Sequence, residues 1–418
     1  MRRYLRLLRR RDYALLWTGA TISAFGDGMS FVALVWLVLE QTGDPRAVGV
    51  VAAAYTAPVI VGGLVAGLLL DRYDRRRLLA LDNVVRGVAV ASVPLAAAAG
   101  TVTTAHLIVV AAIYGLLFMV SVAGIPSLLP TYVPETELTT ANAMETISYS
   151  IAGLAGPAFA GVVIALVGAP AVLAIDALTY GVFAVCLLAM RKPPVHEPRV
   201  EDELAELAGG GLRPALRFVL GTPAILAITL MFMAINVAEG MLSVFLPVYT
   251  TDTLAAGAAT YGLLASAFTA GILGGSIVVG AIGWRWPLGR SIAVAQTATG
   301  LALLLLLGPP GLPMALSSLI LAGLFASSLT AWAQTIRMRL IPPALRGRVF
   351  ALLRTLMNTT PPLGALVGGA MLAADNVTLV IVTMAFVVTI PGAIGLVHPA
   401  LRPIPTTGTA ISPPAPRG

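Results

Sequence analysis

The sequence has few of the residues with which enzymes build catalytic or metal-binding sites. Its 418 residues include one cysteine, Cys186, and three scattered histidines, His106, His196 and His398. A single thiol excludes a disulfide framework and a thiolate metal site, and the isolated histidines form no ligand cluster. The chain also lacks a Walker loop, a His-Glu-x-x-His zinc helix and a Gly-x-Ser-x-Gly elbow. We therefore expect no enzyme activity, no cofactor, no metal and no ATP-driven transport.

Charged residues are also scarce, at 11% of the chain, against about 25% in a typical soluble domain. Hydrophobic residues make up 58% and occur in runs of about 20 or more, which can cross a hydrocarbon core about 30 Å thick. No alternating strand pattern occurs, so an outer-membrane barrel is not expected. The 42 glycines and 29 prolines suit closely packed and broken membrane helices. These features predict an all-α integral membrane protein.

Hydropathy predicts twelve membrane spans. The first follows six arginines and is interrupted by Gly26-Asp27-Gly28; it is too long for a signal peptide, so we interpret it as a retained helix. The predicted spans cover residues 13–39, 47–70, 78–99, 105–127, 141–167, 170–190, 222–248, 258–282, 290–308, 312–336, 349–373 and 377–397.

The arginines predict the orientation of these spans. With twelve crossings, the opposite-side loops (40–46, 100–104, 168–169, 249–257, 309–311 and 374–376) contain only Arg46 as a basic residue. All other loop arginines then fall on the cytoplasmic side, as the positive-inside rule requires. The net charge of +7 thus indicates membrane orientation, and no nucleic-acid partner is expected. The N- and C-termini are predicted to be cytoplasmic.

The spans divide into two sets of six. We predict an N-terminal bundle (1–190), a cytoplasmic loop (191–221), a C-terminal bundle (222–398) and a disordered cytoplasmic tail (399–418). At a constant offset of 208 residues, four positions before and within the fifth span recur in the eleventh, which favours an internal duplication. The matched sets are Pro134, Ala143, Gly156, Gly161 and Pro342, Ala351, Gly364, Gly369.

Several short motifs resemble those of the major facilitator superfamily. The junction of the second and third spans, Gly67 to Arg77, resembles the superfamily's GxxxDRxxRR loop signature. Gly153-Leu-Ala-Gly156-Pro157-Ala-Phe-Ala-Gly161 resembles its antiporter motif. The segments 129–143, 175–177 and 346–351 are similar to the branch containing macrolide and enterobactin exporters.

The resemblance implies two pseudo-symmetric six-helix bundles around a central cavity, working by alternating access. Asp71 is expected to accept N–H groups at the start of a neighbouring helix while the cytoplasmic side is closed, as a conformational latch. The antiporter-like motif (Gly153, Gly156, Pro157, Gly161) hints at exchange, although tight packing alone also explains it. Positive-inside anchoring also explains the arginines, but not Gly67 and Asp71 at this spacing. The latch set is Gly67, Asp71, Arg72, Arg75 and Arg76.

Ionisable residues within spans are functional candidates, because burying a charge in lipid costs a few kcal/mol. Asp27, flanked by glycines, is the first candidate for proton coupling or substrate binding; the alternative is a structural ion pair with Arg86. Glu239, close to Asn236 on the seventh span, is the second candidate, and the alternative is a buried acid hydrogen-bonded across an interface. Asp82 and Arg86 are four residues apart, so they can pair within one helix.

The resulting hypothesis is a monomeric, proton-coupled exporter of an amphipathic small molecule such as a drug, antibiotic or siderophore. We place it in a bacterial inner membrane, because arginine outnumbers lysine 25 to 1, as in GC-rich genomes. The fourth span lacks the intramembrane arginine of many drug–proton antiporters, which leaves their usual proton relay open. A nutrient importer or facilitator of the same fold is one alternative. A non-transporting scaffold or sensor is another.

Overall fold

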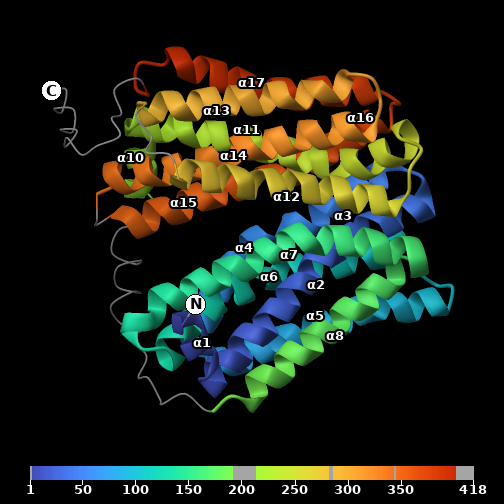
Figure 1. Cartoon of the computed structure of the whole chain (residues 1–418), viewed down its shortest axis with the longest axis vertical. Coiled ribbons are helices and arrows are strands. Elements are labelled where there is room, and N and C mark those ends of the chain that lie inside the picture. The colour runs from blue at the N-terminus through green and yellow to red at the C-terminus, as the bar shows by residue number, and fades with distance from the viewer. Residues whose placement is uncertain (1, 192–212, 282–285, 343–344, 402–418) are drawn as a thin grey trace. The chain divides into compact units, whose positions relative to one another are not determined.

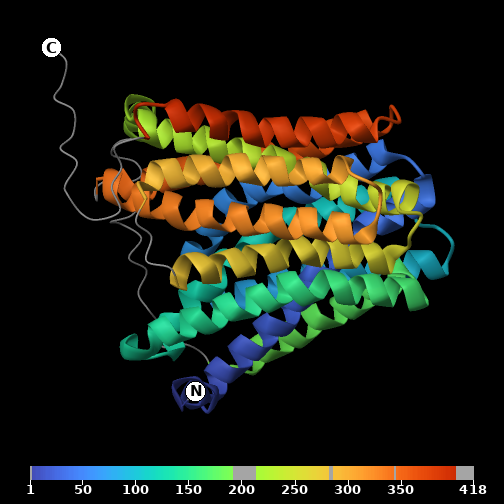
Figure 2. The same ribbon diagram turned by 45° about the horizontal axis from the view of Figure 1, so that its top comes forward.

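The computed structural model describes residues 2–191, 213–281, 286–342 and 345–401. Every regular element in these ranges is a helix (Figures 1 and 2). Long helices suit these apolar runs, because each backbone N–H and C=O must find its partner inside the segment when lipid surrounds it. The predicted all-α membrane fold is confirmed.

The first half of the chain forms five long helices, one helix broken at Ala57 and a short surface helix. Pro58 stands at this break; it lacks an N–H and disfavours helical geometry at the preceding residue. In chain order the elements are α1 (Arg2–Leu8), α2 (Arg11–Thr42), α3 (Pro45–Thr56), α4 (Pro58–Arg72), α5 (Arg75–Ala98), α6 (Thr104–Tyr132), η1 (Glu135–Glu137), α7 (Leu138–Val167) and α8 (Ala169–Ala189).

The second half begins with a short helix where the sequence predicts the end of a loop. This helix, α10 (Arg213–Gly221), buries Ala215 and Val219 on one face. The end of the predicted cytoplasmic loop 191–221 is therefore helical, and residues 192–212 lie outside the described ranges. The remaining elements are α11 (Pro223–Val248), η2 (Tyr249–Thr253), α12 (Ala258–Ala281), α13 (Leu288–Leu303), η3 (Leu304–Leu307), α14 (Leu312–Leu340), α15 (Arg346–Asn358), α16 (Thr360–Leu372) and α17 (Val377–Val397).

Eleven helical segments within the described ranges are long and apolar enough to cross a membrane. The predicted span 349–373 is not among them, because it is divided at Thr359 into α15 and α16, each of 13 residues. Pro361 and Pro362 cause this division, since neither can donate a helical hydrogen bond. The twelfth crossing therefore stays a prediction.

The chain divides into two compact units by packing. Of the described residues, the first contains 2–191, 239–269 and 361–380, and the second contains 213–238, 270–281, 286–342, 345–360 and 381–401. In the first, α2 packs against α7 and α8, and α5 lies between α6 and α8 (Figure 1). In the second, α13 packs along α14. The predicted division at residues 191–221 remains a prediction.

Each unit has its own apolar core. Leu79, Leu128 and Phe183 are fully buried in the first unit, where α2, α5, α6, α7 and α8 meet. Ile292, Leu329 and others form the corresponding core of the second unit. In the first unit this packing surrounds a group of polar side chains that project from α2, α5, α6 and α8.

Candidate functional site

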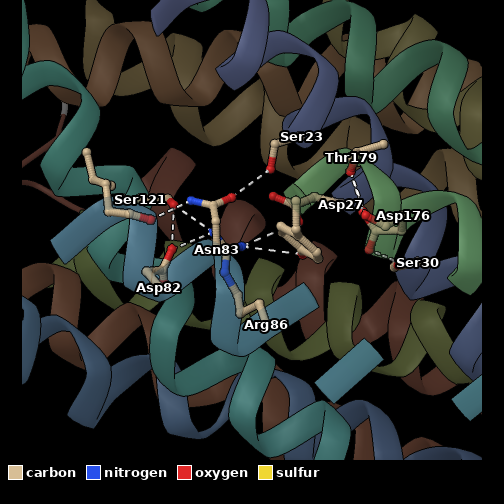
Figure 3. A network of polar contacts seen from close by, with 11 residues as sticks. Ser23, Asp27, Ser30, Asp82, Asn83, Arg86, Ser121, Asp176 and Thr179 are labelled. Atoms are coloured by element: carbon tan, nitrogen blue, oxygen red, sulfur yellow. Dashed lines mark hydrogen bonds and ion pairs between the residues drawn. The ribbon is translucent and has the colours of Figure 1, made fainter. Parts of the chain in front are cut away.

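A polar cluster in the first unit is centred on Asp27, near the middle of the 32-residue α2 (Figure 3). Its carboxylate Oδ1 accepts a short hydrogen bond from the Tyr180 hydroxyl on α8 and lies 3.5 Å from Arg86 Nη1 on α5. The Asp27 side chain keeps 16% of its surface exposed, whereas Arg86 keeps 1%. Asp27 is therefore the member of this pair that water can reach.

Arg86 is shared between two carboxylates. Its Nη2 donates to Asp82 Oδ2 at 2.7 Å and to the Ser121 hydroxyl at 2.6 Å, and Ser121 itself donates to Asp82. The guanidinium also lies over the ring of Tyr180, 4.6 Å from its centroid, a favourable cation–π position. Asp82 thus holds Arg86 more closely than Asp27 does.

The charges of this cluster do not balance when both carboxylates are ionised. Arg86 brings one positive charge, whereas Asp27 and Asp82 bring two negative charges. In addition, Asp82 Oδ1 and Arg86 Nε are buried with no hydrogen-bond partner in the described chain. Since incompletely satisfied buried networks are costly, a purely structural role is poorly served by this arrangement. One proton on a carboxyl group would restore neutrality.

A third carboxyl group, that of Asp176 on α8, is fully buried on the other side of Asp27. It accepts hydrogen bonds from the hydroxyl of Ser30 and, at 2.9 Å, from the hydroxyl of Thr179. Gly26 makes room for it, because a Cβ at this position would overlap Asp176 Oδ1. The glycine beside Asp27 therefore accommodates a second acid.

The structure brings together some of the predicted site residues and adds others. The side chains of Asp27 and Arg86 form an ion pair, as the structural alternative for Asp27 predicts. Arg86 also pairs with Asp82. Sequence reasoning missed Tyr180, Ser121 and the position of Asp176 beside Asp27. The sequence signal for Asp176 is that a carboxylate within an apolar run is rare and costly.

Glu239 and Asn236, the second predicted pair, lie on α11. Glu239 is exposed, although it is near the middle of the helix. Asn236 Nδ2 donates to the carbonyl of Met357 at 2.8 Å. In an uninterrupted helix that carbonyl would accept from residue 361, but Pro361 has no N–H. Asn236 and the Thr360 hydroxyl, which also donates to this carbonyl at 2.8 Å, together satisfy it. A role of Asn236 in coupling or substrate binding stays a prediction.

The antiporter-like motif forms close helix contacts within the first unit. A Cβ on Gly156 would lie 3.0 Å from the backbone carbon of Gly28 on α2, and one on Gly161 would lie 2.5 Å from the carbonyl oxygen of Ala258 on α12. Gly153 leaves only ordinary contact distance to Thr269. These positions serve close packing; their part in exchange stays a prediction, as for Pro157.

The latch set occupies the junction between α4 and α5. Gly67, Asp71 and Arg72 are exposed. Arg76 is buried and donates to the carbonyls of Leu188 and Met190 at the end of α8, where the helix dipole favours a cation. Arg75 donates to the carbonyl of Ser127 on α6 at 3.1 Å. The arginines therefore tie helix ends together, and the action of Asp71 as a latch remains a prediction.

No group of three or more potential metal ligands lies together in the described parts of the chain. The buried cluster offers a partly exposed carboxylate, a shared arginine and aromatic hydroxyls inside a membrane-spanning helix bundle. This set of groups can bind and release a proton or hold a polar ligand group.

The chain matches known proteins along nearly its whole length. Residues 5–410 match the family described as transmembrane secretion effector. The multidrug efflux pump Tap of Mycobacterium tuberculosis is 27% identical over 399 residues, 94% of each chain. The uncharacterized MFS-type transporter y4rN of Sinorhizobium fredii is 26% identical over 358 residues, 84% of this chain and 86% of y4rN.

A solved structure has the same fold. The nucleoside transporter NupG superposes with a TM-score of 0.71 at 15% identity, covering 91% of this chain and 99% of NupG. Taken with the buried polar cluster and the long apolar helices, the family match shows that this chain is a transporter and not an enzyme. The chain belongs to the major facilitator superfamily, in its family of transmembrane secretion effectors.

Proposed function

We propose that this transporter is a proton-coupled exporter of amphipathic small molecules in a bacterial cytoplasmic membrane. Its similarity to multidrug efflux pumps named Tap, which covers 94% of both chains, supports export and a broad substrate class. The observation that carries proton coupling is the arrangement at Asp27, where a partly exposed carboxylate shares one arginine with a second, buried carboxylate.

The unequal sharing of Arg86 suggests how a proton would act. When Asp27 is ionised, Arg86 on α5 is attracted towards both α2 and Asp82. When Asp27 takes up a proton, its attraction for Arg86 falls, and Arg86 is left with Asp82 and Ser121. Proton binding would thus weaken one contact between α2 and α5 while leaving the contact between α5 and α6. A difference in helix contacts is what a proton needs to favour one conformation over another.

The exposed position of Glu239 supports the inference that water reaches one side of α11. A carboxylate facing lipid near the middle of a span costs about 2.5–3.5 kcal/mol on insertion scales. Because Glu239 is exposed at such a position, we infer that it faces water and not lipid. It would then be available to a cationic substrate or to a proton.

The test is transport by purified protein in proteoliposomes under an imposed pH gradient, with ethidium and a panel of neutral and anionic amphiphiles as substrates. We expect gradient-driven movement of at least one compound, and a fall to near background in Asp27→Asn. Glu40→Gln, which neutralises an exposed acid on the same helix, is the matched control and should transport normally.

Three results would contradict the proposal. Transport in Asp27→Asn that still follows the pH gradient at the wild-type rate would remove Asp27 from the coupling step. Movement of compounds at the same rate with and without the gradient would instead identify a facilitator, and accumulation in intact expressing cells would identify an importer.

A further inference from the structure

The short helix α10 is too short to cross a membrane and packs on the second unit by one face. Its nine residues extend about 14 Å at about 1.5 Å per residue, less than half of a hydrocarbon core about 30 Å thick. A single residue separates it from the start of α11, and it lies against α15 (Figure 1). Ala215 and Val219 form its buried face, in a cluster with Ile341, Val349 and Leu353.

The outer face of α10 combines an apolar stripe with a basic one. Leu216 and Leu220, one turn apart, are 44% and 59% exposed. Arg213 and Arg217 are also one turn apart and exposed, and they occupy the adjoining stripe of the helix. Neither arginine forms a hydrogen bond or ion pair with another described residue. Together with a proline and a phenylalanine of α10, they line a hollow of about 510 Å³ that is wide open to the surface.

The unit that carries α10 contains no acidic residue. Neither Asp nor Glu occurs anywhere in its sequence, whereas its described ranges contain eight arginines. The positive-inside rule explains on which side these arginines lie, but it supplies no counter-charge. An anion that approaches this end of the unit therefore meets no carboxylate that would repel it. The arginines lie on α10, α13, α14 and α15: Arg213, Arg217, Arg290, Arg337, Arg339, Arg346, Arg348 and Arg354.

The two stripes together define the kind of partner. Water leaves the two leucines unburied, and a soluble anion or an acidic peptide pairs only with the arginines. A membrane surface that contains anionic phospholipids matches both stripes, because it offers phosphate groups beside an acyl-chain boundary. The position of α10 agrees with this partner, since it adjoins the end of α11 that the arginine pattern predicts to be cytoplasmic.

We propose that α10 lies in the cytoplasmic membrane–water interface and binds an anionic phospholipid. Arg213 and Arg217 contact the phosphate of its headgroup, and Leu216 and Leu220 contact the adjoining acyl chains. This surface goes beyond the proposed export function, because it binds a component of the membrane and not the transported compound.

The experiment uses native mass spectrometry, which resolves individual lipids bound to the full-length purified protein. Phosphatidylglycerol is the probe, and phosphatidylcholine with the same acyl chains is the uncharged comparison. We expect the double variant Arg213→Gln, Arg217→Gln to bind phosphatidylglycerol about tenfold or more weakly, since each arginine near a membrane surface contributes about fivefold in affinity. Its binding of phosphatidylcholine should not change.

Two controls isolate the charge of α10. Arg213→Lys, Arg217→Lys keeps both charges and should retain most phosphatidylglycerol binding. Arg46→Gln removes an exposed arginine that is predicted to lie on the opposite side of the membrane, and it should bind as the wild type does. Misfolding is not expected, because all of these side chains are exposed; size-exclusion chromatography checks this.

A further variant tests the apolar stripe. Leu216→Ser, Leu220→Ser keeps both arginines and should weaken phosphatidylglycerol binding, because the acyl-chain contact is lost. Soluble glycerol 3-phosphate, which carries a phosphate without acyl chains, should not displace the lipid. Displacement by glycerol 3-phosphate, or undiminished binding in the serine variant, would identify a site for free phosphate and overturn the interfacial role of α10.

Other results would overturn the proposal at the arginines. The first is equal affinity of the wild type and the double glutamine variant for phosphatidylglycerol. The second is binding that arises only after Glu201, Asp202 and Glu203, which precede α10 in the sequence, are replaced by their amides. In that case the acidic stretch of the chain, and not a lipid, occupies the basic stripe.

Discussion

At the residue scale, the two carboxylates that share Arg86 have different surroundings. Asp82 is 1% exposed and contacts both Arg86 and Ser121, whereas Asp27 is 16% exposed and lies 3.5 Å from the guanidinium. Removing one partner of a buried ion pair costs about 3–5 kcal/mol, because the other charge stays buried. We therefore expect Asp82 to contribute mainly to stability and Asp27 to be the carboxylate that responds to protons.

This difference predicts opposite effects of two neutralising substitutions. Asp82→Asn should lower the midpoint of thermal unfolding in detergent by several degrees, since Arg86 loses its 2.7 Å partner. Asp27→Asn should change the midpoint much less while abolishing gradient-driven transport. Thermal unfolding monitored by intrinsic fluorescence checks both. A larger loss of stability in Asp27→Asn than in Asp82→Asn would show that the structural and coupling roles are reversed.

The sequence predicts that a buried polar site exists better than it predicts which residues form that site. The sequence identifies Asp27 and Arg86 as candidates because a charge in an apolar run is rare and costly. It does not identify Tyr180, Ser121 and Ser30. Hydroxyl-bearing residues are common in membrane helices, and one sequence does not show which face of a helix they occupy. The pairing of Asn236 with the Met357 carbonyl also depends on two helices that are distant in sequence.

At the scale of helices, the internal repeat coincides with close contacts. Gly161 and Gly369 occupy matched positions of the two halves, 208 residues apart. A Cβ on Gly161 would lie 3.0 Å from the Cα of Gly262 on α12, and one on Gly369 would lie 3.2 Å from the Cα of Gly49 on α3. Both crossings lie within the first packing unit. Each of the two matched glycines thus allows two helix backbones to pack closely.

Alanine at these crossings should therefore separate the helices. In Gly161→Ala the new methyl group would lie 2.5 Å from the Ala258 carbonyl oxygen, and backbone cannot yield as a flexible side chain can. We expect a lower unfolding midpoint and reduced transport. Gly181→Ala on α8 is the matched control, because a Cβ there meets nothing within 4 Å and alanine favours helix by about 1 kcal/mol. Similar midpoints for the two variants would contradict this account of the glycine.

At the scale of the whole molecule, hydropathy predicted most of the helical segments because lipid requires long, internally hydrogen-bonded runs. It did not predict the breaks. The chain is interrupted at Ala57 and Thr359, each one or two residues before proline, and proline in membrane helices produces anything from a slight bend to a full break depending on its neighbours. The number of crossings therefore depends on whether α15 and α16 together span the membrane.

Whether α15 and α16 together cross the membrane determines on which side the C-terminus lies. Residues 346–372, at about 1.5 Å per residue, extend about 40 Å, which suffices to cross the bilayer if α15 and α16 continue in roughly one direction. The count is then even, and both termini are cytoplasmic. We expect green fluorescent protein fused at either terminus to fluoresce, and alkaline phosphatase fused within 374–376 to be active, because the former matures in the cytoplasm and the latter in the periplasm. Should the C-terminal fusion be active only as phosphatase, α15 and α16 would form a re-entrant hairpin, the count would be odd, and Arg402 and Arg417 would stand against the positive-inside rule.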